Sequence, residues 1–349
     1  LSDKAPGPEL ALARLSLTLW PRVLEELRER GIDTDPVEWS PKGGVVVATT
    51  ENGAETLRDF SAAQREVGVR AETLDAAALS AAEPYLTSEV TAAFAYPDDA
   101  QVQPTGAAAA LLAGAVAAGA RVRTGCEVYT AGRTGNRLTG LHTSTGDIGA
   151  DVVVNATGPW SGEVAARLGA PIMVRPRRGE VLVTAPLPAM VFHKVYDADY
   201  VGAVGSGSAA LQTSSVIEST RGGTVLIGSS RQQVGFDDRL RPDVLSAVAA
   251  KATRLFPCLA ATTVMRTYGG FRPYVDDHLP VIGADPRLPG LWHATGHEGA
   301  GIGLAIGTAR LLRCLLLGER PDIDVAPFRA GRPAVVGAVP ASTVRGETS

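Results

Sequence analysis

The sequence predicts a fold of the α/β plus α+β class, in which doubly wound segments alternate along the chain with antiparallel β-rich segments. A short apolar strand at 151–155 turns directly into a helix pattern. A second apolar run at 290–295 enters a helix pattern through a glycine-dense loop. Between these two, residues 174–228 show β segments separated by turn-rich breaks, which predicts an antiparallel sheet.

Composition favours a globular protein with small-molecule partners. The 349 residues favour two structural units over one. With 45% hydrophobic residues, 20% charged residues and a net charge of -4, the chain has no field that would recruit nucleic acid. The longest run without a polar residue, 106–120, is shorter than the roughly 20 residues that a membrane helix needs. We therefore expect neither nucleic acid nor a membrane as partner.

Cysteine usage predicts a reducing, cytoplasmic location. Cys126, Cys258 and Cys314 are far apart and have no C-x-x-C spacing, so neither a disulfide framework nor a zinc site is expected. The chain begins with Leu1, and residues 1–8 lack the pattern of a secretory signal. We expect that the sequence is cut or misassigned at its start.

Apolar spacing predicts that a helix at 8–30 opens the chain and stops at Gly31. Pro21 is expected to kink or divide this helix near Trp20. The following elements are a strand at 43–50, helices at 53–68 and 104–119, a strand at 121–128 and a hairpin at 138–143 and 145–149. The D-V-V-V-N run at 151–155 has no polar alternation, so a strand covered on both faces is expected there, leading into a helix at 161–168.

The second half of the chain predicts the β-rich part and a final helix. The β segments are 179–184, 194–201, 211–218 and 223–229. A helix is expected at 242–255, a strand at 263–270, and the last helix at 302–317, closed by Gly318. Residues 331–349 have little apolar periodicity and are expected to form a loose tail.

The glycine-dense loop at 296–303 is the strongest candidate for a ligand site. Glycine has no Cβ, so such a loop brings bare N–H groups and the positive end of a helix dipole against a flat or anionic ligand. Arg272, at the end of a strand leading back to this loop, is a candidate fork for a carboxylate. The sequence thus predicts a cofactor held by main chain beside an anion-binding arginine.

Other motifs have structural interpretations. The G-x-G-x-x-A match at 205–210 precedes a strand pattern, so we interpret it as a flexible loop. His297 and Glu298 lie in the glycine-dense loop, and His293 precedes His297 by four residues. A metal site would need a third ligand and a defined helix face, and neither is visible, so no metal is expected and a structural or cofactor-contacting role is favoured. The acidic pairs at 98–99 and 276–277, the latter beside His278, are interpreted as solvated loops with capping roles. Neither a Ser-His-Asp order nor a G-x-S-x-G elbow indicates a hydrolase.

Three segments together resemble the flavin-dependent D-amino-acid oxidase and glycine oxidase family. They are V-V-V-N-A-T-G-P-W-S at 152–161, G-F-R-P-Y-V-D-D-H-L-P-V-I-G at 270–283 and T-G-H-E-G-A-G-I-G-L at 295–304. The last of these and the segment at 193–201 are most similar to the branch with D-hydroxyproline and opine dehydrogenase subunits and the flavoprotein subunit of hydrogen cyanide synthase.

The resemblance implies noncovalent FAD in a Rossmann-like domain, interleaved with an antiparallel-sheet substrate domain that roofs the flavin ring. The FAD domain would comprise 1–30, 98–168 and 269–328, and the substrate domain 31–97 and 169–268. The cofactor-binding residues would be Val128, Thr157, Gly158, Trp160, Gly296, Gly299, Gly301, Ile302 and Gly303. Arg272 would bind the substrate carboxylate, with Tyr268, Tyr196, Tyr200 and His297 shaping the pocket.

The activity implied is oxidation of the C–N bond of an amino acid or a carboxylate-bearing secondary amine, by hydride transfer to the flavin. The family's initial strand, G-x-G-x-x-G turn and helix are not found before residue 1, so we expect an incomplete record. A non-catalytic or truncated flavoprotein-like subunit of a heteromeric complex is the alternative. An NAD-linked dehydrogenase ranks third, because its one plausible glycine turn, Gly301–Gly303 with Gly307, lies at the wrong end of the chain.

Overall fold

The computed structural model describes residues 1–198 and 207–337. The chain divides into two compact units, each made of segments that are far apart in the sequence. The first unit comprises Leu1–Thr124, Pro176–Arg272 and Gly299–Ile323, and the second comprises Gly125–Arg175, Pro273–Glu298 and Asp324–Ser349. The boundaries predicted from the sequence for an FAD domain and a substrate domain remain a prediction.

An eight-stranded sheet forms the centre of the first unit, in the order β12-β8-β11-β10-β9-β1-β3-β2. Its strands are β1 (Gly44–Ala48), β2 (Glu72–Thr73), β3 (Ala92–Tyr96), β8 (Arg175–Thr184), β9 (Lys194–Asp197), β10 (Gln212–Ser219), β11 (Val225–Arg231) and β12 (Val264–Tyr274). The pairs β9–β10, β10–β11 and β8–β11 are antiparallel, and β1 pairs with β9 in parallel. The antiparallel sheet predicted for residues 174–228 is confirmed.

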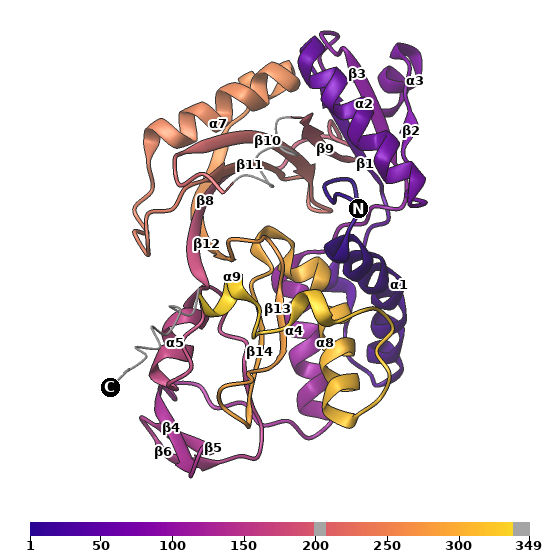
Figure 1. Ribbon diagram of the computed structural model, residues 1–349. Helices are drawn as coiled ribbons and strands as arrows, with labels where there is room; N and C mark the ends of the chain where they lie inside the picture. Colours follow the sequence, from indigo (N-terminus) through magenta and orange to yellow (C-terminus); the bar gives the residue numbers. More distant parts are fainter. Residues whose placement is uncertain (199–206, 338–349) are drawn as a thin grey trace, which may run out of the picture. The chain divides into compact units, whose positions relative to one another are not determined.

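The two faces of this sheet carry different residues, because neighbouring side chains of a strand point to opposite faces. On one face, Leu182 and Ile217 pack against Val248 of α7 (Pro242–Leu255), which lies across β10 and β11 in Figure 1. On the opposite face, at the β1–β3 end, Val46 packs against Leu57 of α2 (Glu51–Glu66). The short helix α3 (Ala76–Ala82) lies beside β2 and β3 in the sequence and contributes to the α7 side through Leu79.

Three further helices pack together in the first unit: α1 (Pro8–Glu29), α4 (Pro104–Ala117) and α8 (Gly301–Leu317). Trp20 and Leu27 of α1 share a core with Ala107 of α4 and Ile306 of α8. The predicted division of α1 at Pro21 is wrong, because the helix runs through it as one element, whereas a kink there stays a prediction. Burial of Trp20 and Leu24 on either side of the proline offsets the cost of about 3 kcal/mol for the interrupted helix bond.

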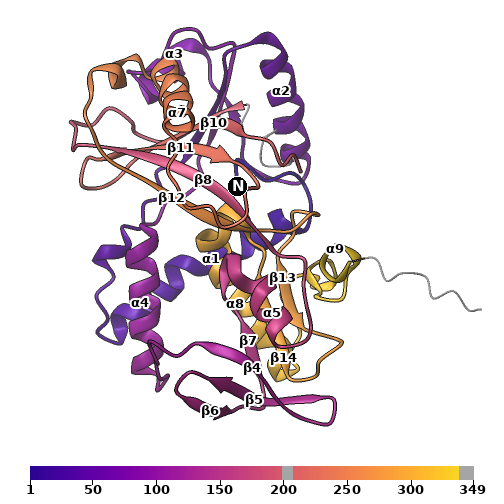
Figure 2. The same cartoon turned by 90° about the vertical axis from the view of Figure 1, so that its left-hand side faces the viewer.

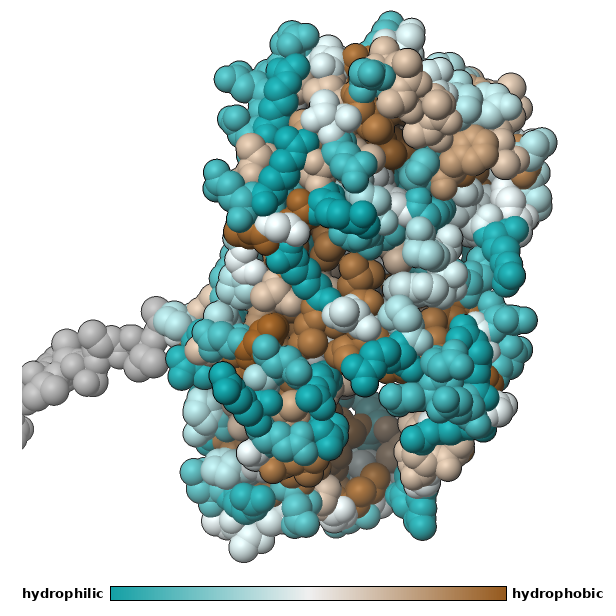
Figure 3. All heavy atoms as spheres, turned by 90° about the vertical axis from the view of Figure 1, so that its right-hand side faces the viewer, coloured by the Kyte–Doolittle hydropathy of each residue, from teal (hydrophilic) through white to brown (hydrophobic). Residues whose placement is uncertain are grey.

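The segment Glu298–Leu317 is, among the described residues, the one helix long and apolar enough to cross a membrane by length and composition alone. This is weak evidence, because the core helix of a globular protein passes the same test. Leu304, Leu311 and Cys314 of α8 are buried within the protein, whereas Leu317 is 62% exposed. Hydrophobic side chains also reach the surface elsewhere, between hydrophilic ones (Figure 3).

The second unit contains two three-stranded sheets. One has the order β13 (Val281–Ala284), β14 (Leu291–Thr295), β7 (Val153–Asn155), and the other has the order β4 (Val128–Thr134), β5 (Arg137–Thr143), β6 (Gly146–Gly149). β14 and β7 are parallel, with His293 opposite Asn155. The hairpin of β5 and β6, and the turn from β7 into α5 (Ser161–Arg167), are confirmed.

Two predicted strand features in this part of the chain are wrong. Residues 121–127 are not a strand, because no described strand bonds to them; the ladder starts at Val128, where β5 supplies the partner. The run at 151–155 is not covered on both faces, since Val154 is 41% exposed. β7 lies at the edge of its sheet, so its neighbours cover fewer of its side chains.

The tail predicted to be loose from residue 331 is ordered in its first part. The helix α9 (Pro333–Val336) buries Val335 against Ile172 and Val174. Arg332 forms an ion pair with Asp277 at 2.6 Å. Residues 338–349 lie outside the described part of the chain.

A buried charge cluster closes the β13–β14 hairpin. Asp285 Oδ2 accepts a hydrogen bond from Arg287 Nη2 at 2.7 Å and lies 3.1 Å from Nε2 of the fully buried His293. Burial alone would raise the pKa of Asp285, but hydrogen bonds from His293 and Arg287 outweigh it and hold the pKa below its ordinary value. The carboxylate therefore stabilises the folded unit.

We expect Asp285→Asn to lower the free energy of unfolding at pH 7 by about 2 kcal/mol, because it leaves Arg287 and His293 without their anion. Since the folded carboxyl has the lower pKa, its contribution is complete above about pH 4 and is lost as the pH falls through the folded value. Urea unfolding at pH 7 measures the loss. Asp322→Asn, which removes an exposed pair with Arg310, is the matched control and should cost at most about 0.5 kcal/mol. Equal effects of the two substitutions would contradict the prediction.

Candidate functional site

One face of the eight-stranded sheet lines a cavity of about 890 Å³ within the first unit. Most of the strand residues that line it occupy alternate positions, so they share the face opposite α7. They are Val181 and Val183 of β8, Lys194 and Tyr196 of β9, Val216 and Glu218 of β10, Leu226 of β11, and Arg266, Tyr268 and Arg272 of β12. The pleat thus separates a packed hydrophobic face from a face that presents charged and aromatic groups to a ligand.

The start of α8 forms another wall of this cavity, with Gly299, Ala300, Ile302 and Gly303. The N-cap residue Ala300 has no side chain that could accept a hydrogen bond from the first helical N–H groups. A Cβ built on Gly303 would meet no protein atom within 4 Å. The helix therefore offers uncapped N–H groups and a bare surface at the cavity.

Two side chains of α1 hold this helix start in place. Ser16 Oγ donates to the carbonyl of Gly303 at 2.5 Å and accepts from the N–H of Gly307 at 3.1 Å. Trp20 Nε1 also donates to the carbonyl of Gly303, at 3.2 Å. Both contacts exploit the i, i+4 spacing of Ser16 and Trp20, which places them on one helix face. This role was missed from the sequence, although the spacing was visible there.

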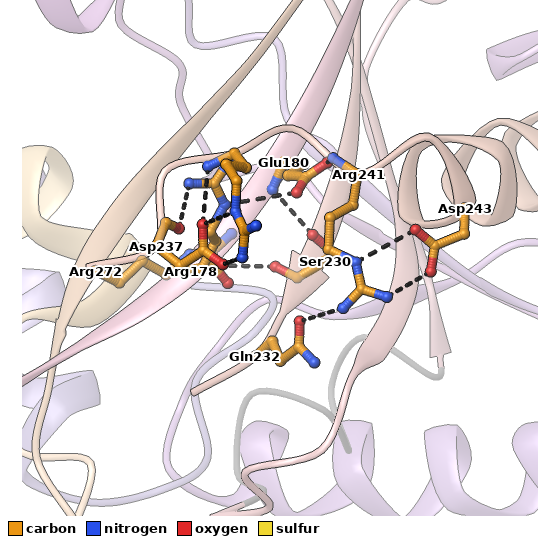
Figure 4. A network of polar contacts seen from close by, with 9 residues as sticks. Arg178, Glu180, Ser230, Gln232, Asp237, Arg241, Asp243 and Arg272 are labelled. Carbon is orange, nitrogen blue, oxygen red and sulfur yellow. Dashed lines mark hydrogen bonds and ion pairs between the residues drawn. The ribbon is translucent and has the colours of Figure 1, made fainter. Parts of the chain in front are cut away.

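Arg272 lies in the cavity with its guanidinium against the sheet (Figure 4). Its Nη1 donates to the backbone carbonyl of Ser230 at 2.9 Å and to that of Arg178 at 3.4 Å. These two backbone carbonyls fix the orientation of the guanidinium at the cavity wall.

The remaining charges of the lining include both signs. Lys194 Nζ lies 3.5 Å from Glu218 Oε2 and 5.2 Å from the centre of the Tyr196 ring. Arg266 lies over the ring of Tyr268 at 5.7 Å. Burial raises the pKa of Tyr268, and the charge of Glu218 adds to this effect. The tyrosine is therefore a neutral hydrogen-bonding group at neutral pH.

A separate set of polar contacts shapes the strand ends in the second unit. The buried Asn155 donates from Nδ2 to the carbonyl of Ser161 at 2.9 Å and accepts from Thr157 Oγ1 at 2.7 Å. Ser161 Oγ donates to Thr295 Oγ1 at 2.8 Å, and Thr295 Oγ1 donates to the carbonyl of Gly158 at 3.2 Å. The turn after β7 is thereby bonded to the end of β14, as expected for neighbouring parallel strands.

The loop after β14 is held by a second pair. His278 Nδ1 lies 2.7 Å from Glu298 Oε1, and both residues have positive φ, 58° and 45° respectively. Non-glycine residues adopt this conformation only where their surroundings hold it. Asp276 and Asp277 pair with Arg175 and Arg332, and Asp277 Oδ1 accepts from the N–H of Leu279 at 3.2 Å. The predicted capping role is confirmed for Asp277, whereas these carboxylates are ion-paired and not simply solvated.

The structure gathers one part of the predicted site in the first unit. Arg272, Tyr268, Tyr196, Gly299, Ile302 and Gly303 line the cavity, and Gly301 is the first residue of α8. Val128, Thr157, Gly158, Trp160, Gly296 and His297 belong to the second unit. Trp160 is 51% exposed, and the carbonyl of Val128 accepts from Arg167 Nη1 at 3.3 Å. Tyr200 lies outside the described residues.

Metal ligation has no support in the residues that the structure describes. No group of three or more His, Cys, Asp or Glu side chains is placed there to hold an ion. His293 contacts Asp285, and Glu298 contacts His278. Two of the three side chains considered for a metal, His293 and Glu298, therefore have structural contacts.

A cavity between a charged sheet face and an uncapped, glycine-rich helix start suits a ligand that is flat or anionic. The family model described as "FAD dependent oxidoreductase" (DAO) matches residues 1–315. The chain belongs to this family. The family prediction made from the three sequence segments is confirmed.

Individual relatives agree. The chain is 32% identical over 332 residues to the glycine oxidase of Geobacillus kaustophilus, covering 93% of this chain and 82% of that protein. The crystal structure of glycine oxidase from Geobacillus kaustophilus matches with a TM-score of 0.83 at 29% identity, over 94% of this chain and 84% of that one. Hydrogen cyanide synthase subunit HcnC of Pseudomonas aeruginosa is 28% identical over 325 residues, covering 92% of this chain and 73% of that subunit.

The residues of the cavity fit the FAD of this family. The open Cβ position of Gly303 leaves room for a flat ring, and the uncapped N–H groups of α8 suit its electron-rich oxygens. The sheet residues opposite supply Arg272 and the tyrosines. The chain is thus an FAD-dependent oxidoreductase related to amino-acid oxidases.

Gly303→Ala separates cofactor binding from stability. The new methyl group meets no protein atom within 4 Å but projects into the cavity, so FAD affinity should fall about tenfold or more. Stability of the FAD-free protein should not fall, because alanine favours the helix by up to about 1 kcal/mol. Gly307→Ala is the control: its methyl would lie 3.0 Å from Leu12 Cδ1 and should destabilise the α1–α8 packing. FAD titration and thermal unfolding measure both effects.

Burial lowers the pKa of His297 from 6.5 to about 4. The unfolded chain therefore binds a proton on this residue between about pH 6.5 and 4 that the folded protein does not bind, so stability falls as the pH falls through this range. We expect His297→Gln to make the free energy of unfolding less dependent on pH between 7 and 5. Denaturant unfolding at both pH values tests this, and an unchanged difference would contradict it.

Proposed function

We propose that this protein oxidises the C–N bond of an amino acid, or of a secondary amine that carries a carboxylate. The observation that carries the proposal is the place of Arg272: its guanidinium lines the cavity, and its Nη1 donates to the backbone carbonyls of Ser230 and Arg178, which orient it there. An arginine at the wall of a cavity binds a carboxylate through charge-assisted hydrogen bonds. The similarity to proteins that are named glycine oxidase supports an amino acid as the substrate.

Positioning carries most of the proposed catalysis. Arg272 would hold the carboxylate, so that the carbon bearing the amine faces the cofactor ring at the α8 wall. Bound FAD supplies the acceptor for two electrons and a proton. The N–H groups at the start of α8 would stabilise the negative charge that this acceptor gains. Tyr268 and Tyr196 would shape the substrate pocket. His297, whose lowered pKa keeps its imidazole neutral at pH 7, would also help to shape it.

Further properties belong to the same proposal. We propose noncovalent FAD, with Val128, Thr157, Gly158 and Trp160 among the residues that bind it. We also propose a cytoplasmic location, which is supported by the three cysteines, since none of them forms a disulfide. A heteromeric dehydrogenase is supported by the likeness to a protein named as a hydrogen cyanide synthase subunit.

The protein should be purified, reconstituted with FAD and tested with glycine, sarcosine, D-alanine and D-proline, following bleaching of the flavin absorbance without oxygen. We expect a yellow protein that at least one of these amines bleaches. A protein that takes up FAD but is bleached by no amine would support the non-catalytic subunit instead. Failure to take up FAD would overturn the proposal.

Arg272→Ala should retain the flavin and raise the KM for a carboxylate-bearing substrate by about a hundredfold, since charge-assisted hydrogen bonds contribute about 1.5–3 kcal/mol each. The matched control is Arg28→Ala, which removes an exposed arginine paired with Glu25 and should leave the kinetics unchanged. Steady-state kinetics at fixed FAD saturation measures the effect. Unchanged kinetics for Arg272→Ala would show that another group binds the acid.

A further inference from the structure

β8 and β12 each carry one arginine that lies over a glycine of the other strand. The two strands are neighbours in the sheet. Arg272 of β12 lies over Gly179 of β8, and Arg178 of β8 lies over Gly269 of β12. Because side chains alternate between faces, the first pair lies on the cavity face and the second lies on the opposite face.

The fit on the cavity face leaves no room for a side chain at position 179. A Cβ built on Gly179 would lie 2.5 Å from Arg272 Nη2 and 2.6 Å from Cζ, and closer still to Nη1. The three nearest atoms all belong to this guanidinium. The plane of the arginine therefore rests directly on the backbone of β8, where its Nη1 reaches the carbonyls of Arg178 and Ser230.

The opposite face holds the two strands in the register that this arrangement needs. Arg178 is almost fully buried, lies 5.5 Å from the centre of the Phe271 ring and donates to the carbonyl of Asp237 at 2.7 Å. Its Nε lies 3.5 Å from Oε1 of the buried Glu180, whose N–H donates to Ser230 Oγ at 2.9 Å. Figure 4 shows these groups clustered around Ser230 and Arg272.

We propose that Gly179 is a positioning residue for the carboxylate-binding arginine: its bare backbone is the seat that sets the direction of the Arg272 guanidinium. The proposal rests on the function proposed above for Arg272. It adds that substrate affinity depends on a strand glycine that need not touch the substrate. A methyl at this position would push the guanidinium off the carbonyls, which is possible without unfolding because the end of an arginine side chain is flexible.

The test compares Gly179→Ala with Gly149→Ala, a strand glycine whose Cβ would meet nothing within 4 Å. We expect Gly179→Ala to keep its flavin, to raise the KM for the amino-acid substrate by about tenfold or more and to weaken acetate binding equally, with kcat changed by less than about threefold. Gly149→Ala should behave as the parent. A KM and an acetate affinity for Gly179→Ala equal to those of the parent would overturn the proposal.

A double-mutant cycle with Arg272→Ala distinguishes an effect of Gly179→Ala on the Arg272 guanidinium from an effect on the rest of the protein. If Gly179 acts through the guanidinium, adding Gly179→Ala to Arg272→Ala should change neither KM nor acetate affinity further. If Gly179→Ala alone fails to fold, the double variant should fold, because the clashing group is gone. A further loss in the double variant, or its failure to fold, would show that the methyl acts on other atoms and would overturn the proposal.

A crystal structure of Gly179→Ala without FAD gives a readout that needs no activity. The distance from Arg272 Nη1 to the Ser230 carbonyl, 2.9 Å in the parent, should exceed hydrogen-bonding range. An unchanged distance would overturn the proposed seat, even if the proposed oxidation holds. Conversely, if the parent protein takes up no FAD, the proposed function is wrong. The crystal structure of Gly179→Ala can still show a displaced Arg272 in that case, so the two proposals fail separately.

Discussion

The pleat of the eight-stranded sheet is the constraint on which the site depends. Because successive side chains leave a strand on opposite faces, one face can carry the apolar side chains that pack against α7 while the other presents Arg266, Tyr268 and Arg272 to a cavity. The apolar face stabilises the unit, so the cavity face is free to carry charge. A shift of one residue in β12 would exchange the two sets and bury the arginines under α7.

Burying positive charge in such a sheet requires partners that do not cancel the charge. Arg272 uses the carbonyls of Ser230 and Arg178, which satisfy N–H donors while leaving the guanidinium cationic. Arg178, on the other face, is instead close to the carboxylate of Glu180. The same residue type therefore has two settings: on one face Arg178 braces the strands, and on the other Arg272 lines the cavity.

Much of the fold followed from local patterns. Periodicity located α1, α4, α7 and α8, and glycine correctly ended the last helix at Gly318, which has a φ of 68°. The errors arose where tertiary contacts decide. Core packing carries α1 through Pro21, and no described strand pairs with residues 121–127, although Val122 in this segment favours a strand. The short strand β3 was missed because its alanines have little intrinsic preference for strands.

The sequence by itself determined the residue types of the site: a glycine-dense helix start, an arginine after a strand and a family likeness that the comparisons confirm. These are local features, since each is set by neighbours in the chain. Only the tertiary structure decided that Ser16 and Trp20 support Gly303, and that Gly179 lies under Arg272. Such contacts join residues far apart in the chain, and strand register and helix packing bring them together, which no local pattern encodes.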